Sequence, residues 1–233
     1  MKSFVINSLP LLFLFVAVVA CSDTQKATSK EDKPVVVPYN ADVDNPLMMK
    51  TLEDFIELGV NSNGPKAAKL LLKPSLDYYV GLKQAVFSET KEQVQARSFV
   101  DQVIIMRIRI KADMEILAKL DSLQFTEYIY RSGYVDKSSI QYHSMGEITY
   151  NEETKEAKAP VLIKGEAKDG YYTFKKENNV WKVDISEAIP HVNQQMEDDI
   201  SDNGGSPAYM LNLVLLSANS GKELSEQLWG PRR

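Results

Sequence analysis

The sequence predicts an α+β domain in which N-terminal helices pack on a curved antiparallel sheet, with further helices after it. Three observations carry this prediction. Apolar side chains recur at helical spacing between residues 46 and 130, and at every second position between residues 140 and 185. A third apolar stretch, at residues 207–216, follows a Ser-Pro pair and predicts a C-terminal helix. We expect a single domain over residues 46–233.

Residues 1–20 have the layout of a secretory signal peptide. Lys2 supplies a positive start, residues 9–19 are almost continuously apolar, and the small Ala20 precedes Cys21, the only cysteine of the chain. The run Val18-Val19-Ala20-Cys21 also resembles a bacterial lipobox. That resemblance implies a diacylglyceryl group on the sulfur, cleavage before Cys21 and acylation of the new N-terminus.

Two other interpretations explain the N-terminal segment less well. A transmembrane helix needs about 20 apolar residues, and the run from Ile6 to Ala20 is shorter and contains Asn7, Ser8 and Pro10. A plain cleaved signal would leave Cys21 as an unpaired thiol in an oxidising compartment, where such thiols are a liability. The lipoprotein interpretation explains both the place and the singleness of this cysteine, and two or three acyl chains suffice for stable anchoring.

Residues 21–45 are expected to be a flexible tether. Residues 22–33 hold no apolar residue larger than alanine, so they cannot bury enough surface to offset the entropy of ordering. The acylated Cys21 would attach the chain to a lipid bilayer in the bacterial cell envelope. Ser22, in place of an aspartate after the cysteine, favours the outer membrane.

Composition narrows the class of protein. Apolar residues make up 44% and charged residues 25% of the chain, as in ordinary globular domains. The formal net charge of −5 argues against nucleic acid as a partner, because nucleic-acid binding requires clustered lysine and arginine. A single cysteine leaves no intramolecular disulfide, so packing must stabilise the fold.

End signals delimit the expected helices before the sheet. Asn45-Pro46 starts the first helix and Gly59 ends it. Asn63-Gly64-Pro65 opens a second helix, which Pro74 stops, and Ser75 caps a third. Thr90 and Gln93 form a capping box for a fourth. Residues 103–111 alternate like a strand, but their flanks are helical in pattern, so we expect helix there too. Apolar stripes at residues 114–123 and 125–129 continue the helical part.

The strand pattern begins after Gly133. Strands are expected at residues 140–143, 147–150, 161–166, 171–175 and 180–185, with turns at 151–155, 168–170 and Asn178-Asn179. One face of the last two strands is expected to be buried, with Trp181 packed beneath the helices. After Pro190 an acidic stretch leads to the helix at 207–216, which is apolar nearly all round and therefore predicted to be buried on several sides.

The order of helices and a closing hairpin at Phe174–Asp184 resembles the nuclear-transport-factor-2-like superfamily, and above all its uncharacterised bacterial lipoprotein members. The resemblance spans about residues 46–231 and includes Met106–Arg109, Phe125–Tyr130, Gly133–Val135, Gly146–Ile148 and Leu228–Pro231. It implies the cone-shaped α+β fold of ketosteroid isomerase. It brings no catalytic motif, and the superfamily includes enzymes, binding proteins and scaffolds.

Few residues suggest chemistry. His143 is expected on the first strand, where it is either a base facing the cone or, more commonly for such a histidine, a surface or hydrogen-bonded residue. His191 is expected to be structural. No cluster has zinc-ligand spacing. Residues 199–204 imitate the start of a calcium loop, but Met210 stands where a bidentate glutamate is required. We therefore expect neither a metal nor a cofactor.

Arg107 and Arg109 stand in an otherwise apolar run, and a buried guanidinium is costly unless it is paired. We expect one or both to reach solvent or to pair with Glu147 or Asp184. The alternative is a pocket arginine that binds an anionic ligand, for which Arg107 is the candidate. The tyrosines of the sheet form either core or a ligand-binding wall, with Tyr142 and Tyr172 as candidates for the wall.

The sequence therefore predicts a membrane-anchored envelope lipoprotein that binds a protein partner or a small hydrophobic ligand through the concave face of its sheet. An enzyme is the less favoured interpretation, because no catalytic set is evident. Its form would be a ketosteroid-isomerase or polyketide-cyclase type that acts on a small hydrophobic molecule, with His143 or a pocket acid as base.

Overall fold

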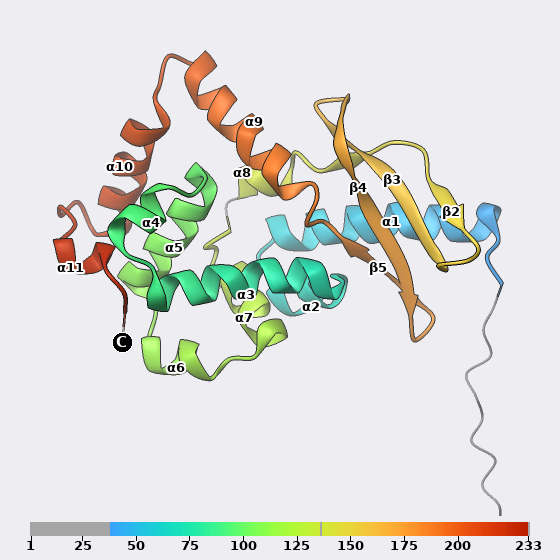
Figure 1. Cartoon of the computed structure of the whole chain (residues 1–233), viewed down its shortest axis with the longest axis horizontal. Helices are drawn as coiled ribbons and strands as arrows, with labels where there is room; N and C mark the ends of the chain where they lie inside the picture. The colour runs from blue at the N-terminus through green and yellow to red at the C-terminus, as the bar shows by residue number, and fades with distance from the viewer. Residues whose placement is uncertain (1–37, 136, 233) are drawn as a thin grey trace, which may run out of the picture. The chain divides into compact units, whose positions relative to one another are not determined.

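The computed structural model describes residues 38–135 and 137–232 (Figure 1). The expected signal peptide, the lipidated Cys21 and most of the expected tether lie outside these residues. The described chain has the predicted α+β architecture, in which helices before and after the sheet surround a curled antiparallel half-barrel (Figure 1).

Eight helices precede the sheet in the described chain: α1 (Ala41–Val60), α2 (Gly64–Lys69), α3 (Lys73–Ser88), α4 (Lys91–Gln95), α5 (Phe99–Lys111), α6 (Met114–Lys119), α7 (Ser122–Arg131) and α8 (Lys137–Ile140). The capping box of Thr90 and Gln93 is confirmed at the start of α4. The helical assignment of residues 103–111 is also confirmed, because they form most of α5.

The first helix begins earlier than predicted. Asn40, not Asn45, caps α1, and its side chain accepts a hydrogen bond from the backbone N–H of Asp42. The carboxylate of Asp44 accepts from the Asn40 N–H at 2.8 Å, so two side chains satisfy the helix start. Pro46 consequently lies inside the helix, and the expected tether boundary at residue 45 falls within α1. The start of α3 also differs, since Leu72 and not Ser75 is its N-cap.

The sheet contains β1 (Ser144–Met145), β2 (Thr149–Asn151), β3 (Glu156–Ile163), β4 (Glu166–Glu177) and β5 (Val180–Asp184). The strands run antiparallel in the order β1-β3-β4-β5, and β2 pairs with the other end of β3. The strand predicted at residues 140–143 is wrong: Ile140 ends α8 and a turn follows to His143. This segment is too short to tell a strand from a helical turn by periodicity.

The turn predicted at residues 168–170 is also wrong. The chain turns earlier, at Lys164-Gly165, where both residues have positive φ (52° and 82°). Residues 168–170 lie within β4, opposite a register shift between Pro160 and Leu162 of β3. Gly170 takes φ 104° there, so its freedom serves a bulge rather than a turn. The Asn178-Asn179 hairpin is confirmed, with φ of 51° and 63°.

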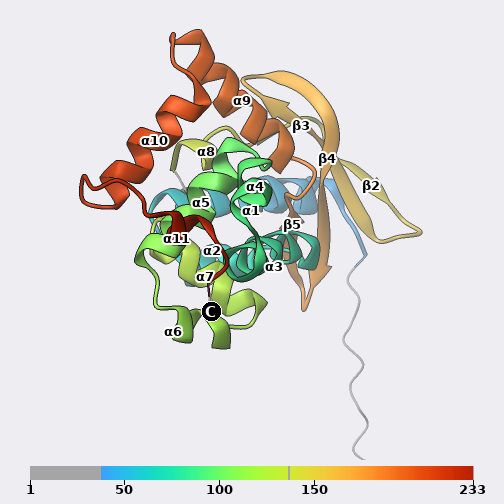
Figure 2. The same cartoon turned by 60° about the vertical axis from the view of Figure 1, so that its left-hand side comes forward.

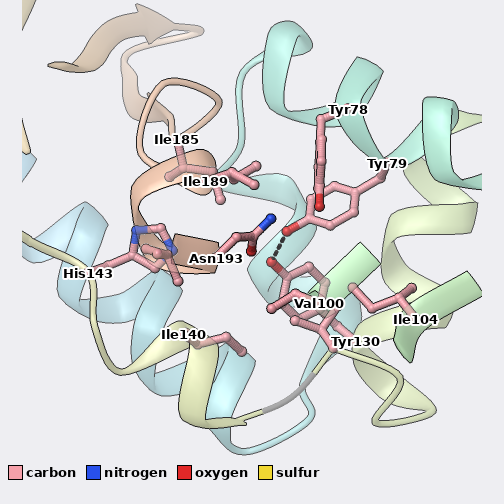
Figure 3. A pocket seen from close by; sticks show the side chains of 12 residues that line it. Tyr78, Tyr79, Val100, Ile104, Tyr130, Ile140, His143, Ile185, Ile189 and Asn193 are labelled. Atoms are coloured by element: carbon pink, nitrogen blue, oxygen red, sulfur yellow. Dashed lines mark hydrogen bonds between the residues drawn. The ribbon is translucent and has the colours of Figure 1, made fainter. Parts of the chain in front are cut away.

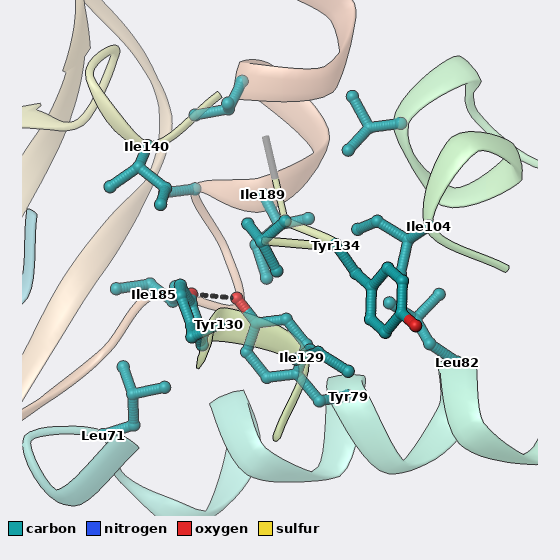
Figure 4. Close-up of a cluster of buried hydrophobic side chains, with 14 of the residues drawn as sticks. Leu71, Tyr79, Leu82, Ile104, Ile129, Tyr130, Tyr134, Ile140, Ile185 and Ile189 are labelled. Atoms are coloured by element: carbon teal, nitrogen blue, oxygen red, sulfur yellow. Dashed lines mark hydrogen bonds between the residues drawn. The ribbon is translucent and has the colours of Figure 1, made fainter. Parts of the chain in front are cut away.

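The core lies between the helices and one face of the sheet. The predicted buried face is confirmed, since Tyr172, Phe174, Trp181, Val183 and Ile185 are all buried. Figure 4 shows side chains of α3, α5 and α7 gathered beside Ile185 and Ile189. Helices α2 and α7 approach so closely at Gly64 that a Cβ there would stand 2.0 Å from the carbonyl oxygen of Glu127. A glycine is therefore required at this crossing.

Three helices follow the sheet: α9 (Ile189–Asp202), α10 (Pro207–Ala218) and α11 (Glu226–Trp229). The prediction that the helix at 207–216 is buried on several sides is wrong. Only Leu211 and Leu215 of α10 are buried, while Tyr209 is 61% and Leu213 is 42% exposed. The helix packs one face on α5, and Figure 2 shows it at the outside of the domain. Nothing in the described chain covers its other face.

None of the helices among the described residues is both long enough and apolar enough to cross a bilayer.

Candidate functional site

A small cavity lies between α3, α5, α7 and α9. Its volume is about 30 Å³, and His143, Asn193 and the Tyr79–Tyr130 pair supply its polar groups, with aliphatic side chains between them (Figure 3). A cavity of this size holds roughly two water molecules. It is too small for a ring-sized hydrophobic substrate.

His143 stands at one side of the cavity, immediately before β1 (Figure 3). Its Nδ1 lies 2.9 Å from the hydroxyl oxygen of Tyr172, and its ring meets Phe55 edge-on. The side chain is buried, and burial lowers its pKa to about 4. The imidazole is therefore neutral near pH 7. Burial also raises the pKa of Tyr172, so neither partner is charged.

Two more hydroxyls meet on the opposite wall. The phenol oxygens of Tyr79 and Tyr130 are 2.5 Å apart, and burial raises the pKa of both groups. Asn193 of α9 lies between this pair and His143 and donates from Nδ2 to Ser98 Oγ at 2.9 Å (Figure 3). Every buried side-chain nitrogen and oxygen in the described residues has a hydrogen-bond partner. These groups are thus neutral and satisfied.

A buried candidate acid, Asp101, lies outside the cavity. Asp101 accepts a 2.5 Å hydrogen bond from the Tyr78 hydroxyl and lies 3.5 Å from Arg97 Nη1. Burial raises its pKa, against the lowering effect of those partners. Asp101 and Arg97 line an open cleft of about 480 Å³, which shares Tyr78, Ile189 and Asn193 with the cavity. Tyr78 and Asn193 therefore stand between the acid and His143.

Sequence reasoning missed this Tyr78–Asp101–Asn193 group. The three residues come from α3, α5 and α9, and no local pattern joins them. A buried tyrosine beside a carboxylate leaves no trace in the periodicity of either helix.

Arg109 is buried and has a structural partner that was not predicted. Its guanidinium donates to the carbonyl oxygens of Ala85, Val86 and Glu89, at 2.7, 3.1 and 2.8 Å, and to that of Trp229 at 2.5 Å. The first three lie at the C-terminus of α3, where the Ala85 carbonyl also accepts from the Glu89 N–H and the Val86 carbonyl has no helical partner. A cation there is also favoured by the helix dipole. The expected pairing of Arg109 with solvent, Glu147 or Asp184 is therefore wrong.

Arg107 is half-buried rather than free in a pocket. Its Nη1 donates to the Tyr134 carbonyl oxygen at 3.4 Å, and its guanidinium lies over the Tyr134 ring. Asp184, one of the two acids expected to pair with these arginines, instead accepts from the Ser75 hydroxyl at 2.7 Å and the Ser186 N–H at 2.9 Å. In the described part of the chain, neither arginine forms the expected ion pair.

The two candidate wall tyrosines do not lie together. Tyr172 is fully buried in the core. Tyr142 is half-buried and donates a short hydrogen bond to Asp199, which also forms an ion pair with Lys164 at 2.5 Å. Those hydrogen bonds lower the pKa of Asp199 to about 2. Asp199 lies within α9, so the calcium-loop pattern at 199–204 is a helix end. No metal-binding group of three His, Cys, Asp or Glu occurs in residues 38–135 and 137–232.

A second candidate site lies between α10 and residues of α4, α5, α9 and α11. A cleft of about 440 Å³ opens there, lined by Phe99, Leu211 and Trp229 on the apolar side and by Arg97, Glu197 and Asn212 among the polar groups. It adjoins the exposed face of α10. The carbonyl of Trp229, held by Arg109, fixes the chain end that forms one wall.

Comparison with known proteins gave no match, whether to a protein-family model, to a curated protein or to a solved structure.

Proposed function

We propose that this protein is a bacterial lipoprotein, anchored through an acylated Cys21 in the cell envelope, whose α+β domain binds a partner protein. The observation that carries the binding role is α10, an apolar helix with Tyr209 and Leu213 exposed. An apolar helix face that residues 38–135 and 137–232 leave uncovered is typical of an interaction site. A small hydrophobic ligand in the neighbouring cleft is the other occupant that the sequence allows.

The anchor rests on the sequence. A charged start, an apolar core and a lipobox-like Val18–Cys21 precede a polar segment before the described domain. Ser22 favours the outer membrane as the location. The resemblance to the nuclear-transport-factor-2-like superfamily remains part of this proposal. That superfamily includes bacterial lipoproteins, so the resemblance is consistent with the proposed anchor.

The cavity beside His143 supports the enzyme alternative less well. A ketosteroid-isomerase-like reaction needs a base, an acid and a substrate-sized pocket in one place. Here His143 is neutral, its partner is Tyr172, and the adjoining cavity of about 30 Å³ is lined by no carboxylate in the described chain. The binding role is therefore the better-supported function.

Fractionation tests the anchor. Wild-type chain and Cys21→Ala are expressed in the native host, and membranes are separated from soluble envelope proteins. We expect wild type with the outer membrane, and the variant as an unprocessed precursor that carries no lipid. Radiolabelled palmitate should enter wild type alone. Equal membrane binding and equal labelling of the two chains would refute the anchor.

Crosslinking in intact envelopes tests the binding role. We expect wild type to recover a defined partner, and His143→Ala to recover it equally. Recovery of no partner, combined with a turnover that His143→Ala abolishes, would favour the enzyme.

A further inference from the structure

The surface of α10 is unusual in charge as well as in exposure. From Gly204 to Gly221 the sequence has no charged residue. Tyr209 and Leu213 are one turn apart, and Leu216 extends their stripe on the side opposite the buried Leu211 and Leu215. Twelve helical residues give this surface a length of about 18 Å.

Carboxylates stand at both ends of this uncharged helix. Asp198 and Asp202 are exposed at the end of α9, just before α10, and Glu223 is exposed just after it. Residues 189–229 hold six carboxylates and one lysine, so this stretch carries a formal charge of −5, equal to that of the whole chain. Lys164 pairs with Asp199 at 2.5 Å and Lys91 with Glu226 at 3.0 Å. Among the described residues, Asp198, Asp202 and Glu223 are therefore the exposed carboxylates of this stretch that form no ion pair.

We propose that α10 is the docking site for a basic amphipathic helix of the partner protein. Apolar side chains of that helix pack on Tyr209 and Leu213, and lysine or arginine residues about three turns apart meet the acidic groups at the two ends. The inference rests on the proposed binding role and adds the chemistry of the partner. Interfaces of this kind combine an apolar, charge-poor centre with a polar rim.

The same charges disfavour two other occupants. In a symmetric dimer through α10, each acidic stretch would face its own copy, and like charges across an interface cost free energy. A bilayer with anionic lipids would likewise repel this face, because membrane-binding helices are rich in lysine and arginine. A basic helix meets opposite charge at both ends.

The cleft beside α10 supplies a recess for an anchoring side chain. Phe99, Leu211 and Trp229 line it, and Ala208 and Asn212 connect it around α10 to the exposed stripe. Large apolar side chains buried in such recesses commonly dominate the affinity of an interface. A bulky apolar residue at the centre of the partner helix would fit this arrangement.

A designed peptide pair tests the proposal. The intact protein is reconstituted in nanodiscs of zwitterionic lipid. Fluorescein-labelled 18-residue amphipathic peptides of leucine and lysine are titrated, and binding is followed by anisotropy. The control peptide replaces each lysine by glutamate, and empty nanodiscs correct for lipid binding. We expect the lysine peptide to bind at least tenfold more tightly than the glutamate peptide, and to weaken at least tenfold between 50 and 500 mM salt, as charge-assisted contacts should.

Variants locate the binding. Leu213→Ser and the charge reversal Asp202→Lys/Glu223→Lys should each weaken lysine-peptide binding at least fivefold. Ile116→Ser and Glu115→Lys, exposed positions on α6, should change it by less than twofold. Equal binding of both peptides, or loss of affinity in the α6 variants alone, would overturn the proposal. A dimer that Leu213→Ser dissolves in analytical ultracentrifugation would identify a second copy as the occupant instead. Failure here, with the Cys21→Ala result as expected, removes the docking site and leaves the anchor.

Discussion

The indole nitrogen of Trp181 donates a 2.8 Å hydrogen bond to Oδ1 of Asp44, and so joins β5 to the first turn of α1. Lys176 donates to the same carboxylate oxygen at 2.8 Å and lies over the indole ring. Residues 137 positions apart in the sequence thus form one buried polar cluster. This cluster fixes where the long first helix lies on the sheet.

Truncation of Trp181 tests the importance of this contact. We expect Trp181→Ala to lower the free energy of unfolding by about 3–5 kcal/mol, because it removes a large buried ring and leaves Asp44 short of a donor. Urea unfolding followed by circular dichroism measures the loss. Val180→Ala, at the exposed neighbouring position, should cost under about 0.5 kcal/mol. A loss below about 1 kcal/mol for Trp181→Ala would show that the ring contributes little.

Acid should weaken the same cluster. Burial alone would raise the pKa of Asp44, but hydrogen bonds from Lys176, Asn40 and Trp181 outweigh it and lower the pKa below its ordinary value of 3.8. A lowered pKa gives stability that is present above the unfolded-state value and is lost as pH falls through the folded-state value. We expect Asp44→Asn to abolish this component of the acid sensitivity below about pH 4. Parallel unfolding curves for variant and wild type from pH 5 to pH 2 would contradict this.

His143 should make stability fall in a higher pH range. Its pKa is about 4 in the folded protein against 6.5 for the free side chain. Between these values the unfolded chain binds the proton and the folded chain does not, so stability is complete above pH 6.5 and falls towards pH 4. The difference corresponds to about 3 kcal/mol. Urea midpoints at pH 7.5 and pH 4.5 should converge in His143→Phe, while His191→Gln should retain the wild-type difference.

Arg109 should not tolerate replacement by lysine. The guanidinium serves four carbonyl oxygens, and a lysine ammonium has only three donors in a different geometry. We expect Arg109→Lys to cost about 2–4 kcal/mol, since buried carbonyls lose their donors. Arg107→Lys, at the half-buried neighbour, should cost under about 1 kcal/mol. Thermal melts of both variants measure the contrast. Equal losses of stability would show that the bonds from Arg109 to the α3 terminus do not stabilise the fold more than the contacts of Arg107 do.

Two glycines should respond oppositely to alanine. At Gly64 the new Cβ would meet the Glu127 carbonyl oxygen at 2.0 Å and the Arg131 nitrogen at 2.8 Å, both of them backbone atoms. We expect Gly64→Ala to destabilise by about 3 kcal/mol or more. Gly81, inside α3, has no atom within 4 Å of such a Cβ, and Gly81→Ala should stabilise by about 0.5–1 kcal/mol. Differential scanning calorimetry of the two variants measures the contrast, and equal melting temperatures would contradict it.

The sequence predicted the fold class because its signals are local. Helical period before residue 130, the Thr90–Gln93 capping box and the Asn178-Asn179 hairpin each need only a few neighbouring residues. The errors came where two local structures share one signal. Asn-Pro at 45–46 can start a helix or lie within one, and Lys-Asp-Gly at 168–170 fits a turn or a bulge.

The candidate sites were harder to predict because their residues meet only in the folded chain. Arg109 donates hydrogen bonds to carbonyls at the end of a helix 20 or more residues away in the sequence. Tyr78 donates a hydrogen bond to Asp101 on the next long helix. The burial expected for residues 207–216 was wrong for a different reason. Periodicity reports how much apolar surface a helix carries, but not whether the same chain covers it.

The outer edge of β5 has a consequence for a protein held at high surface density. Leu70 and Leu72 pair with the backbone of Val183, Thr51 bonds the Trp181 carbonyl, and Ser75 accepts from the Ile185 N–H. At the opposite edge the pairing is divided between the two short strands β1 and β2. Neighbouring molecules that the proposed anchor would confine to two dimensions would therefore meet little free backbone for strand-to-strand pairing. Such crowding should leave the protein dispersed rather than polymerised into intermolecular sheets.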